Sequence, residues 1–206
     1  MSYVFKLAES EEEFVGVRRL NHQAFADELG QHEATGTGLL RDRFEEKSRY
    51  VIALRDNRVV GMLAIHDKAP YSIEQRLNDP AILDAIPGRK LEVRLLAIDT
   101  RHRNGMVFSG LLGTMIEDAF REGYDALLIS GVAERIAMYR RLGFRELGPP
   151  VESGRARFVP MAMRLAEMPQ RVREDIRRWR SHRDQADTAD TGDARFLFAP
   201  DGAPTT

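Results

Sequence analysis

The chain has 206 residues, of which 43% are hydrophobic and 31% charged, and this length and composition predict one globular domain with an appendage. Its formal net charge of -1 provides no overall field that would hold nucleic acid or an anionic membrane. It contains no cysteine, which excludes a disulfide scaffold, a thiolate metal site and a cysteine nucleophile.

The chain begins with a predicted strand and a predicted helix. Residues 3–7 alternate in hydropathy as a short strand does, and they lead to acidic Glu9 too soon for a signal peptide. Ser10 and Glu13 have the spacing of a capping box, and apolar residues then recur at helical spacing for about four turns, to Phe25. No window approaches the ~18 consecutive apolar residues of a membrane helix. We therefore expect a cytoplasmic protein that does not insert into membranes.

Strands and helices alternate through the rest of the first 166 residues. In chain order, the patterns predict a loop at 30–38, a hairpin with strands 50–54 and 59–65, an irregular stretch at 70–87 with one helical turn, a strand at 91–99, a helix with Val107, Leu111, Met115 and Phe120 on its buried face, a strand at 124–132, a short helix at 133–142 and a strand at 158–165. Antiparallel pairs come first and a strand–helix–strand crossover follows. This order predicts an α/β fold of the α+β type, with a mixed, mostly antiparallel central sheet and helices on both faces.

The character of the chain changes after this domain, which we place at residues 1–166. Residues 167–206 are predicted to form an amphipathic helix, with Val172, Ile176 and Trp179 on its apolar face, followed by a flexible acidic linker and tail. The apolar face is expected to cover a patch on the domain or on a partner. The arginines around it are expected to face solvent or to dock an acidic carrier protein.

The stretch from the predicted strand at 91–99 into the next helix is the first candidate for chemistry. The start of a helix presents unpaired amides and the positive end of the dipole, so it can hold a phosphate. Arg101 and Arg103 would add cationic donors there. The alternative is an ordinary strand-to-helix turn with solvated arginines.

A second stretch, residues 137–144, places Tyr139 in the last turns of a short helix that Gly143 ends. Together the two stretches resemble the GNAT acyltransferase superfamily, with its Arg/Gln-x-x-Gly-x-Gly/Ala loop and its later Tyr motif that often carries the general acid. The resemblance covers residues 3–165 and implies a GNAT-like fold. It also implies an acyl-CoA or acyl-4'-phosphopantetheine co-substrate, held by Leu96, Ala97, Ile98, Arg101, Arg103, Asn104, Gly105, Met106, Val107 and Phe108.

Two of these residues depart from the superfamily motif. Met106 and Phe108 stand where small residues are usual, and their bulk is expected to obstruct the close backbone approach that glycine permits. An acyl carrier protein, which has a single phosphate on its pantetheine, therefore becomes a reasonable donor beside acyl-CoA.

A narrower resemblance is to acyl-homoserine-lactone synthases and long-chain N-acyl amino acid synthases. That branch has an Arg…Phe helix, then Asp-x-(Tyr/Phe)-Asp, then a hairpin, then Glu-x-Ser-Arg entering the central strand. Here Glu45 replaces the second Asp, the serine is missing and Arg94 comes one position early. The matching positions, which the resemblance implies bind substrate, are Arg18 or Arg19, Phe25, Asp42, Glu45 and Arg94, and of the two arginines we predict Arg19. Asp42 and Glu45 are expected to recognise the amine or to order the loop before the hairpin, and a solvated acidic run is an equally good interpretation of them.

These motifs predict acyl transfer to a small-molecule amine by direct attack. An alkylamine with a pKa of about 10.4 is mostly charged at neutral pH, so a base is required. Glu92 is the candidate base, directly or through water, and its alternative role is an ion pair with Arg94. Tyr139 would protonate the leaving sulfur, or else simply pack on the sheet. Backbone amides near Leu96–Ile98 would bind the oxyanion.

Other functions compete with acyl transfer, whereas the sequence offers no sign of a metal site. None of the five histidines has a partner at metal-ligand spacing, so we expect no metal and interpret each as a surface or loop residue. The alternative functions are a non-catalytic acyl-thioester sensor or partner module, and a simple acetyl-CoA-dependent N-acetyltransferase. The sequence does not indicate an oligomeric state.

Overall fold

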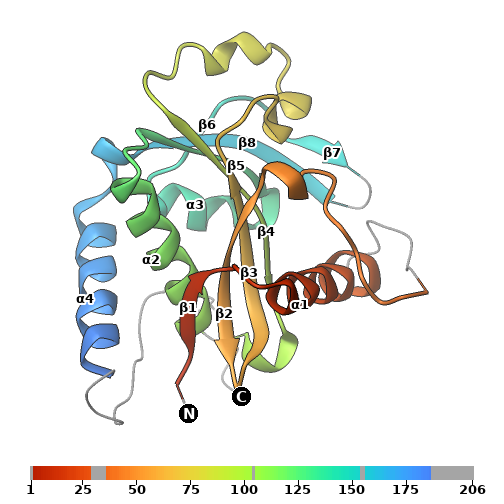
Figure 1. Ribbon diagram of the computed structural model, residues 1–206. Coiled ribbons are helices and arrows are strands. Elements are labelled where there is room, and N and C mark those ends of the chain that lie inside the picture. Colours follow the sequence, from red (N-terminus) through yellow and green to blue (C-terminus); the bar gives the residue numbers. More distant parts are fainter. Residues whose placement is uncertain (1, 29–35, 104, 154–155, 187–206) are drawn as a thin grey trace, which may run out of the picture.

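The computed structural model describes residues 2–28, 36–103, 105–153 and 156–186. One eight-stranded sheet organises them, in the order β1-β2-β3-β4-β5-β8-β6, with β7 paired to β8 (Figure 1). The strands are β1 (Val4–Leu7), β2 (Arg49–Arg55), β3 (Arg58–His66), β4 (Lys90–Ile98), β5 (Ala126–Val132), β6 (Arg145–Glu146), β7 (Val151–Ser153) and β8 (Ala156–Arg164). Among these described strands, β4 and β5 pair in parallel and the other neighbours are antiparallel. The predicted mixed, mostly antiparallel sheet is therefore confirmed.

Four α-helices and several short helical segments complete the part of the fold that the structure describes. The α-helices are α1 (Glu11–His22), α2 (Gly105–Arg121), α3 (Ile136–Leu142) and α4 (Gln170–Ala186). The short segments are the π-helix η1 (Gln23–Glu28) and the 3₁₀ turns η2 (Glu45–Lys47), η3 (Ser72–Arg76), η4 (Pro80–Leu83), η5 (Thr100–His102), η6 (Ala133–Arg135) and η7 (Leu165–Glu167). In the described part of the chain, none of the helices combines the length and hydrophobicity needed to cross a membrane.

Helix α1 covers one face of the sheet. Its predicted capping box forms, because the Ser10 side chain accepts from the Glu13 amide while the Glu13 carboxylate accepts from the Ser10 amide. Val17 and Leu20 then pack against Tyr50 and other residues on the same side of β2 and β3. Because side chains alternate along a strand, the neighbours of Tyr50 on β2 point to the opposite face.

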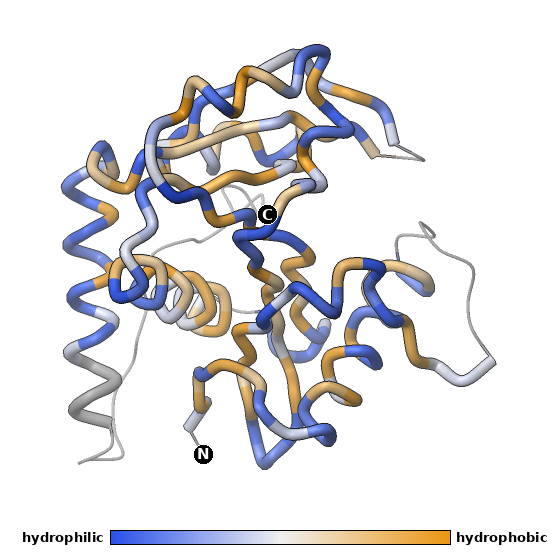
Figure 2. Tube along the Cα trace, turned by 45° about the horizontal axis from the view of Figure 1, so that its top comes forward, coloured by the Kyte–Doolittle hydropathy of each residue, from blue (hydrophilic) through white to orange (hydrophobic). Residues whose placement is uncertain are grey.

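That opposite face is covered by α2, and α4 lies outside α2. Val107, Leu111 and Met115 are fully buried in the larger core, and Figure 2 shows α2 as mostly hydrophobic where it lies between the sheet and α4. A Cβ at Gly113 would lie 2.5 Å from the Trp179 ring, so the absence of a side chain there allows α4 to approach closely. The apolar face predicted for the C-terminal helix therefore packs on the domain.

The sequence patterns were wrong in two details of this fold. Phe120 was expected on the buried face of α2 but is 50% exposed, because the buried stripe continues at Ala119 and Phe120 lies one residue, or about 100°, further around the helix. The short strands β6 and β7 were not predicted, since two or three residues are too few to show a period. The predictions for most of the loop at 30–38, for Asn104 and for the acidic tail beyond Ala186 lie outside the described residues.

Candidate functional site

The pairing of β4 with β5 ends halfway along both strands. Residues pair from Lys90–Ala126 up to Val93–Ile129, whereas β4 continues to Ile98 and β5 to Val132. We call the unpaired part, residues 94–98 of β4 and 130–132 of β5, the splay. Within the described residues no strand pairs with β4 on its β5 side here. The backbone amides of Leu96–Ile98, predicted to bind an oxyanion, lie in the splay.

A β-bulge in β4 coincides with this divergence. On β3 the register advances two residues, from Met62 to Ala64, while on β4 it covers three, from Ala97 back to Arg94. Within the bulge Leu95 has a φ of 48°, a left-handed conformation that typically costs a bulky residue about 1–3 kcal/mol. Strain of this kind, held in place by a sheet, is typical of sites where the backbone itself acts on a ligand.

The start of α2 follows the splay directly, through η5. The Arg103 guanidinium donates from Nε to the Ile98 carbonyl at 3.0 Å and forms an ion pair with Glu28 of η1. Arg101 is exposed and pairs with Asp99 at 3.1 Å. Both predicted phosphate-binding arginines therefore lie beside the helix start, and each is held by a carboxylate.

The bulky residues of the first turn of α2 lie on different sides of the helix. Met106 is 40% exposed, whereas Val107 is buried and lies so close to β3 that a Cβ at Gly61 would come within 2.9 Å of it. Phe108 is half-buried. Met106 and Leu96, which is 42% exposed, add apolar surface beside the splay and the start of α2.

Two ion pairs on the α1 side bring together most of the predicted substrate-binding residues. Arg94 donates to both carboxylate oxygens of Asp42, at 2.7 and 3.3 Å. Arg18 donates through Nε and Nη2 to Glu45, with its shortest contact at 2.7 Å. Burial opposes the charge of Glu45, but hydrogen bonds from Arg18 and Arg41 outweigh it and hold the pKa of this carboxyl below its ordinary value.

Of the two α1 arginines, Arg18 and not Arg19 contacts another of the predicted substrate-binding residues. Arg19 is exposed and makes no ion pair within the described residues, because it lies one position, or about 100°, around the helix from Arg18. Phe25, on η1, packs against the core on the α1 side of the sheet. Sequence reasoning also missed Tyr50, which is 1% exposed and whose hydroxyl has no hydrogen-bond partner among the described residues.

Glu92 occupies a fully buried position in β4. Its carboxylate accepts from the Ser72 hydroxyl at 2.6 Å, from the Ser72 amide at 2.7 Å and from the Ile73 amide at 2.7 Å. His66 Nε2 lies 2.7 Å from it on the other side. Burial would raise the pKa of Glu92, but these contacts outweigh burial and lower it. A carboxylate with no exposed surface does not reach a bound amine, so direct proton abstraction by Glu92 does not fit this structure.

The expectation that His66 and His22 are surface or loop residues is also wrong. His66 is 2% exposed because β3 is covered on both faces up to its last residue, and its ring stacks between Phe44 and Tyr71. His22 is 7% exposed at the end of α1, beside Asp27. A strand buried on both faces shows no alternation, so its end could not be recognised from hydropathy.

Tyr139 of α3 lies over the β5 side of the splay. A Cβ at Gly131 would come within 2.6 Å of the Tyr139 ring, so only glycine allows this contact. Burial raises the pKa of the Tyr139 hydroxyl, and a hydrogen bond with the Val132 backbone opposes this only in part. The hydroxyl is therefore protonated at neutral pH, as a general acid must be.

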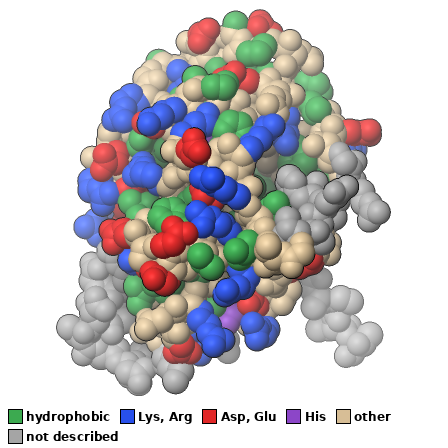
Figure 3. All heavy atoms as spheres, turned by 45° about the vertical axis from the view of Figure 1, so that its right-hand side comes forward, with side chains coloured by type: hydrophobic (Ala, Val, Ile, Leu, Met, Phe, Trp, Pro, Cys, Tyr) green, Lys and Arg blue, Asp and Glu red, His purple; other side chains and the backbone are tan. Residues whose placement is uncertain are grey.

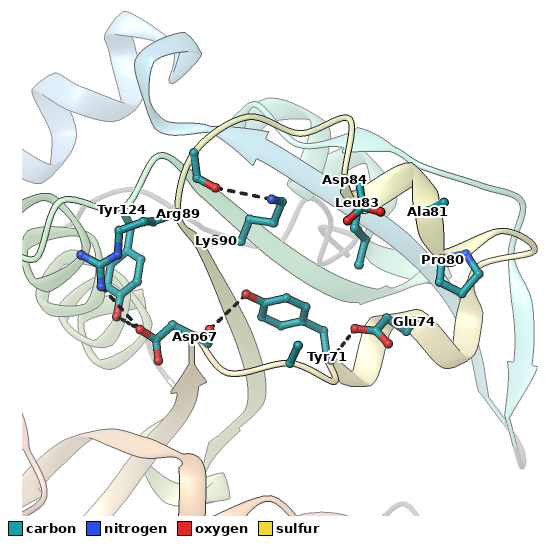
Figure 4. A pocket seen from close by; sticks show the side chains of 12 residues that line it. Asp67, Tyr71, Glu74, Pro80, Ala81, Leu83, Asp84, Arg89, Lys90 and Tyr124 are labelled. Carbon is teal, nitrogen blue, oxygen red and sulfur yellow. Dashed lines mark hydrogen bonds and ion pairs between the residues drawn. The ribbon is translucent and has the colours of Figure 1, made fainter.

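A cavity of about 530 Å³ lies at the other end of β4 (Figure 4). Tyr71 and Tyr124 form part of its wall, and both hydroxyls contact Asp67, at its carbonyl and its carboxylate respectively. Lys90, the first residue of β4, also lines this cavity and comes four residues before Arg94 in the strand. It is thus separate from the splay and from α2.

The face that carries α1 shows Lys, Arg, Asp and Glu side chains intermixed (Figure 3), which matches the small net charge.

The chain is similar to known acyltransferases in sequence and in fold. The profile of the family described as N-acyl amino acid synthase FeeM matches residues 16–166, whereas no curated protein matches. A CoA-dependent acyl-homoserine lactone synthase, BjaI, solved with SAM and isopentyl-CoA, is 16% identical, with a TM-score of 0.70 over 86% of this chain and 89% of BjaI.

Two further solved structures share this fold. FeeM, an N-acyl amino acid synthase from uncultured soil microbes, is 19% identical, with a TM-score of 0.65 over 92% of this chain and 99% of FeeM. The acyl-homoserine lactone synthase LasI is 17% identical, with a TM-score of 0.63 over 80% of this chain and 90% of LasI. At such identities the likeness concerns the fold, and the expected GNAT-like fold is confirmed.

Proposed function

Because the chain belongs to the N-acyl amino acid synthase FeeM family and is an N-acyltransferase, we propose that it joins an acyl group from a pantetheine thioester to the amine of an amino acid. The observation that carries this proposal is the splay, where a strained bulge lies in β4 and no strand of the described residues pairs with the β5 side of residues 94–98. The family enzymes act on thioesters and amines, so a non-catalytic sensor is not favoured.

The donor lies along the splay in this proposal. In this proposal the backbone amides of the Leu96–Ile98 stretch that point away from β3 receive the thioester carbonyl as it becomes an oxyanion, and each such donor typically lowers a barrier by about 3 kcal/mol. The phosphate of the pantetheine arm then reaches the start of α2, where Arg103 turns from Glu28 to the phosphate. Leu96 and Met106 offer apolar surface to the acyl chain or to the pantetheine.

The acceptor binds at the Asp42–Arg94 pair. An α-amino acid carries one positive and one negative group, and this pair offers a carboxylate and a guanidinium side by side, with exposed fractions of 7% and 12%. A zwitterion placed here satisfies both charges, whereas a simple alkylamine leaves Arg94 without an anion. Arg18 and Glu45 hold the loop that carries Asp42 against α1.

The chemistry is then a direct displacement. The ammonium of the bound amino acid first loses a proton to solvent. The neutral amine nitrogen then attacks the thioester carbon, the oxyanion forms at the splay, and its collapse breaks the C–S bond. Tyr139, protonated at neutral pH, donates its proton to the leaving sulfur. After attack the nitrogen releases its second proton to solvent, since Glu92 is enclosed, and solvent returns a proton to Tyr139.

Purified protein incubated with acyl-CoA and acyl carrier protein thioesters of different chain lengths, each with a panel of amino acids, tests the proposal. Free thiol release that depends on the amino acid, together with an amide product of the expected mass, is the supporting result. A strict preference for the two-carbon donor would instead identify a simple N-acetyltransferase. No turnover with any donor and acceptor would contradict the proposal.

A further inference from the structure

The hydroxyl of Ser72 joins the buried carboxylate of Glu92 to the guanidinium of Arg94. It donates to Glu92 Oε1 at 2.6 Å and accepts from Arg94 Nε at 3.0 Å. Arg94 in turn uses its two terminal nitrogens on Asp42. A continuous chain of hydrogen bonds therefore runs from the interior of the sheet to the proposed acceptor site.

The direction of each hydrogen bond in this chain is determined. A serine hydroxyl has one proton, an ionised carboxylate only accepts and a guanidinium only donates, so the proton lies toward Glu92, whose pKa is lowered by its hydrogen bonds, and a lone pair lies toward Arg94. The guanidinium is planar, so fixing Nε also fixes the plane in which its two terminal nitrogens meet Asp42. The Ser72 hydroxyl thus sets the orientation of the whole Arg94 fork.

Ser72 itself is held firmly. It begins η3 and is 5% exposed, and its amide and that of Ile73 both donate to Glu92. His66 closes the other side of the carboxylate, and its ring is stacked on Tyr71, the residue before Ser72. The hydroxyl therefore has little freedom to move away from Arg94.

We propose that Ser72 is a positioning residue for acyl transfer, which presents Arg94 and Asp42 to the amino acid in one fixed geometry. Glu92 acts through Ser72 as its buried anchor. The serine that the Glu-x-Ser-Arg motif would supply from the strand is absent here, and a hydroxyl from η3, twenty residues upstream of Glu92, takes a place between the glutamate and the arginine. This inference rests on the function proposed above.

The variant Ser72→Ala tests it, because it removes the hydroxyl and keeps both backbone hydrogen bonds to Glu92. We expect the KM for the amino acid to rise about tenfold, as for the loss of a hydrogen bond to a charged group, while the KM for the donor and the Tm change little. Thr114→Val is the matched control: it removes a buried hydroxyl on α2 that has no partner among the described residues, and all three values should stay constant.

A double-mutant cycle provides a readout that a purely structural role would not move. If Ser72 acts through Arg94, Ser72→Ala should have almost no further effect on the acceptor KM in an Arg94→Gln background. Additive effects, or an unchanged acceptor KM in Ser72→Ala, would overturn the inference while the wild-type turnover still supports the proposed function. Absence of wild-type turnover would overturn both.

Discussion

The Arg94 guanidinium holds both oxygens of Asp42, at 2.7 and 3.3 Å, although Asp42 comes from the loop after α1 and Arg94 from the middle of the sheet. The centre of the Phe44 ring lies 4.2 Å from the central carbon of the same guanidinium. The ring therefore packs on the face of the guanidinium, while Asp42 holds its two terminal nitrogens. This pair connects the loop, the bulged strand and the buried Glu92, and it is where we place the amino acid.

Replacing Arg94 by lysine should therefore strongly weaken binding of the amino acid. Lysine keeps the positive charge but loses the flat, two-pronged geometry, so we expect the KM for the amino acid to rise about tenfold or more with little change in the donor KM. Steady-state kinetics with each substrate varied in turn measure both. Arg58→Lys, at the exposed start of β3, is the matched control and should have no effect. Equal kinetics for the two variants would remove Arg94 from the acceptor site.

Removing the carboxylate that pairs with Arg103 should strengthen donor binding. In Glu28→Gln the guanidinium no longer has to leave an anion before it meets a phosphate, so we expect the donor KM to fall about threefold at low ionic strength and less at high salt. Glu174→Gln, an exposed charge on α4, controls for the change in net charge. An unchanged donor KM would mean that Arg103 does not meet the donor phosphate.

Tyr139→Phe should lower kcat about a hundredfold without loss of fold, because the ring still packs over Gly131 while the proton donor is gone. Burial raises the pKa of this hydroxyl above its ordinary value of 10.0, so wild-type kcat should not decline on the alkaline side below pH 10. Tyr124→Phe, beside the separate cavity, is the control. A Tyr139→Phe enzyme with wild-type kcat would show that the sulfur is protonated by another group.

Acid should destabilise the fold through Glu45. Its pKa is lower in the folded state, so its contribution to stability is complete above the ordinary value of 4.5 and is lost as pH falls through the lower, folded value. We expect the Tm to fall steeply below about pH 4.5, and Glu45→Gln to flatten that dependence and to cost about 3 kcal/mol at pH 7. Thermal unfolding between pH 3 and pH 7 measures both. Parallel curves for wild type and variant would assign the acid sensitivity elsewhere.

Much of the fold could be predicted from local patterns. The capping box of Ser10 and Glu13, the hairpin from Arg49 to His66 and the buried stripe at the start of α2 all depend on residues near one another in sequence. The order of strands and helices followed from these segments, and with it the mixed sheet.

The arrangement of the site depends on contacts between distant residues, which such patterns do not encode. Ser72 and Glu92 are twenty residues apart, and nothing in the sequence around either residue indicates that the Ser72 hydroxyl donates to the Glu92 carboxylate. The same is true of Gly131 beneath Tyr139, and of the pairing of Glu45 with Arg18 rather than Arg19. The motif therefore predicted where Glu92 lies in the chain, but its enclosure by η3 and His66 became evident only in three dimensions.

The most direct test of the account is a structure of the protein with a non-hydrolysable acyl-CoA, in which a methylene separates the sulfur from the carbonyl. We predict that the carbonyl oxygen lies against the backbone amides of Leu96–Ile98, with the phosphates at the start of α2 and Arg103 turned away from Glu28. An analogue bound instead in the cavity beside Tyr71 and Lys90, or continued pairing of Arg103 with Glu28 in the loaded protein, would contradict it.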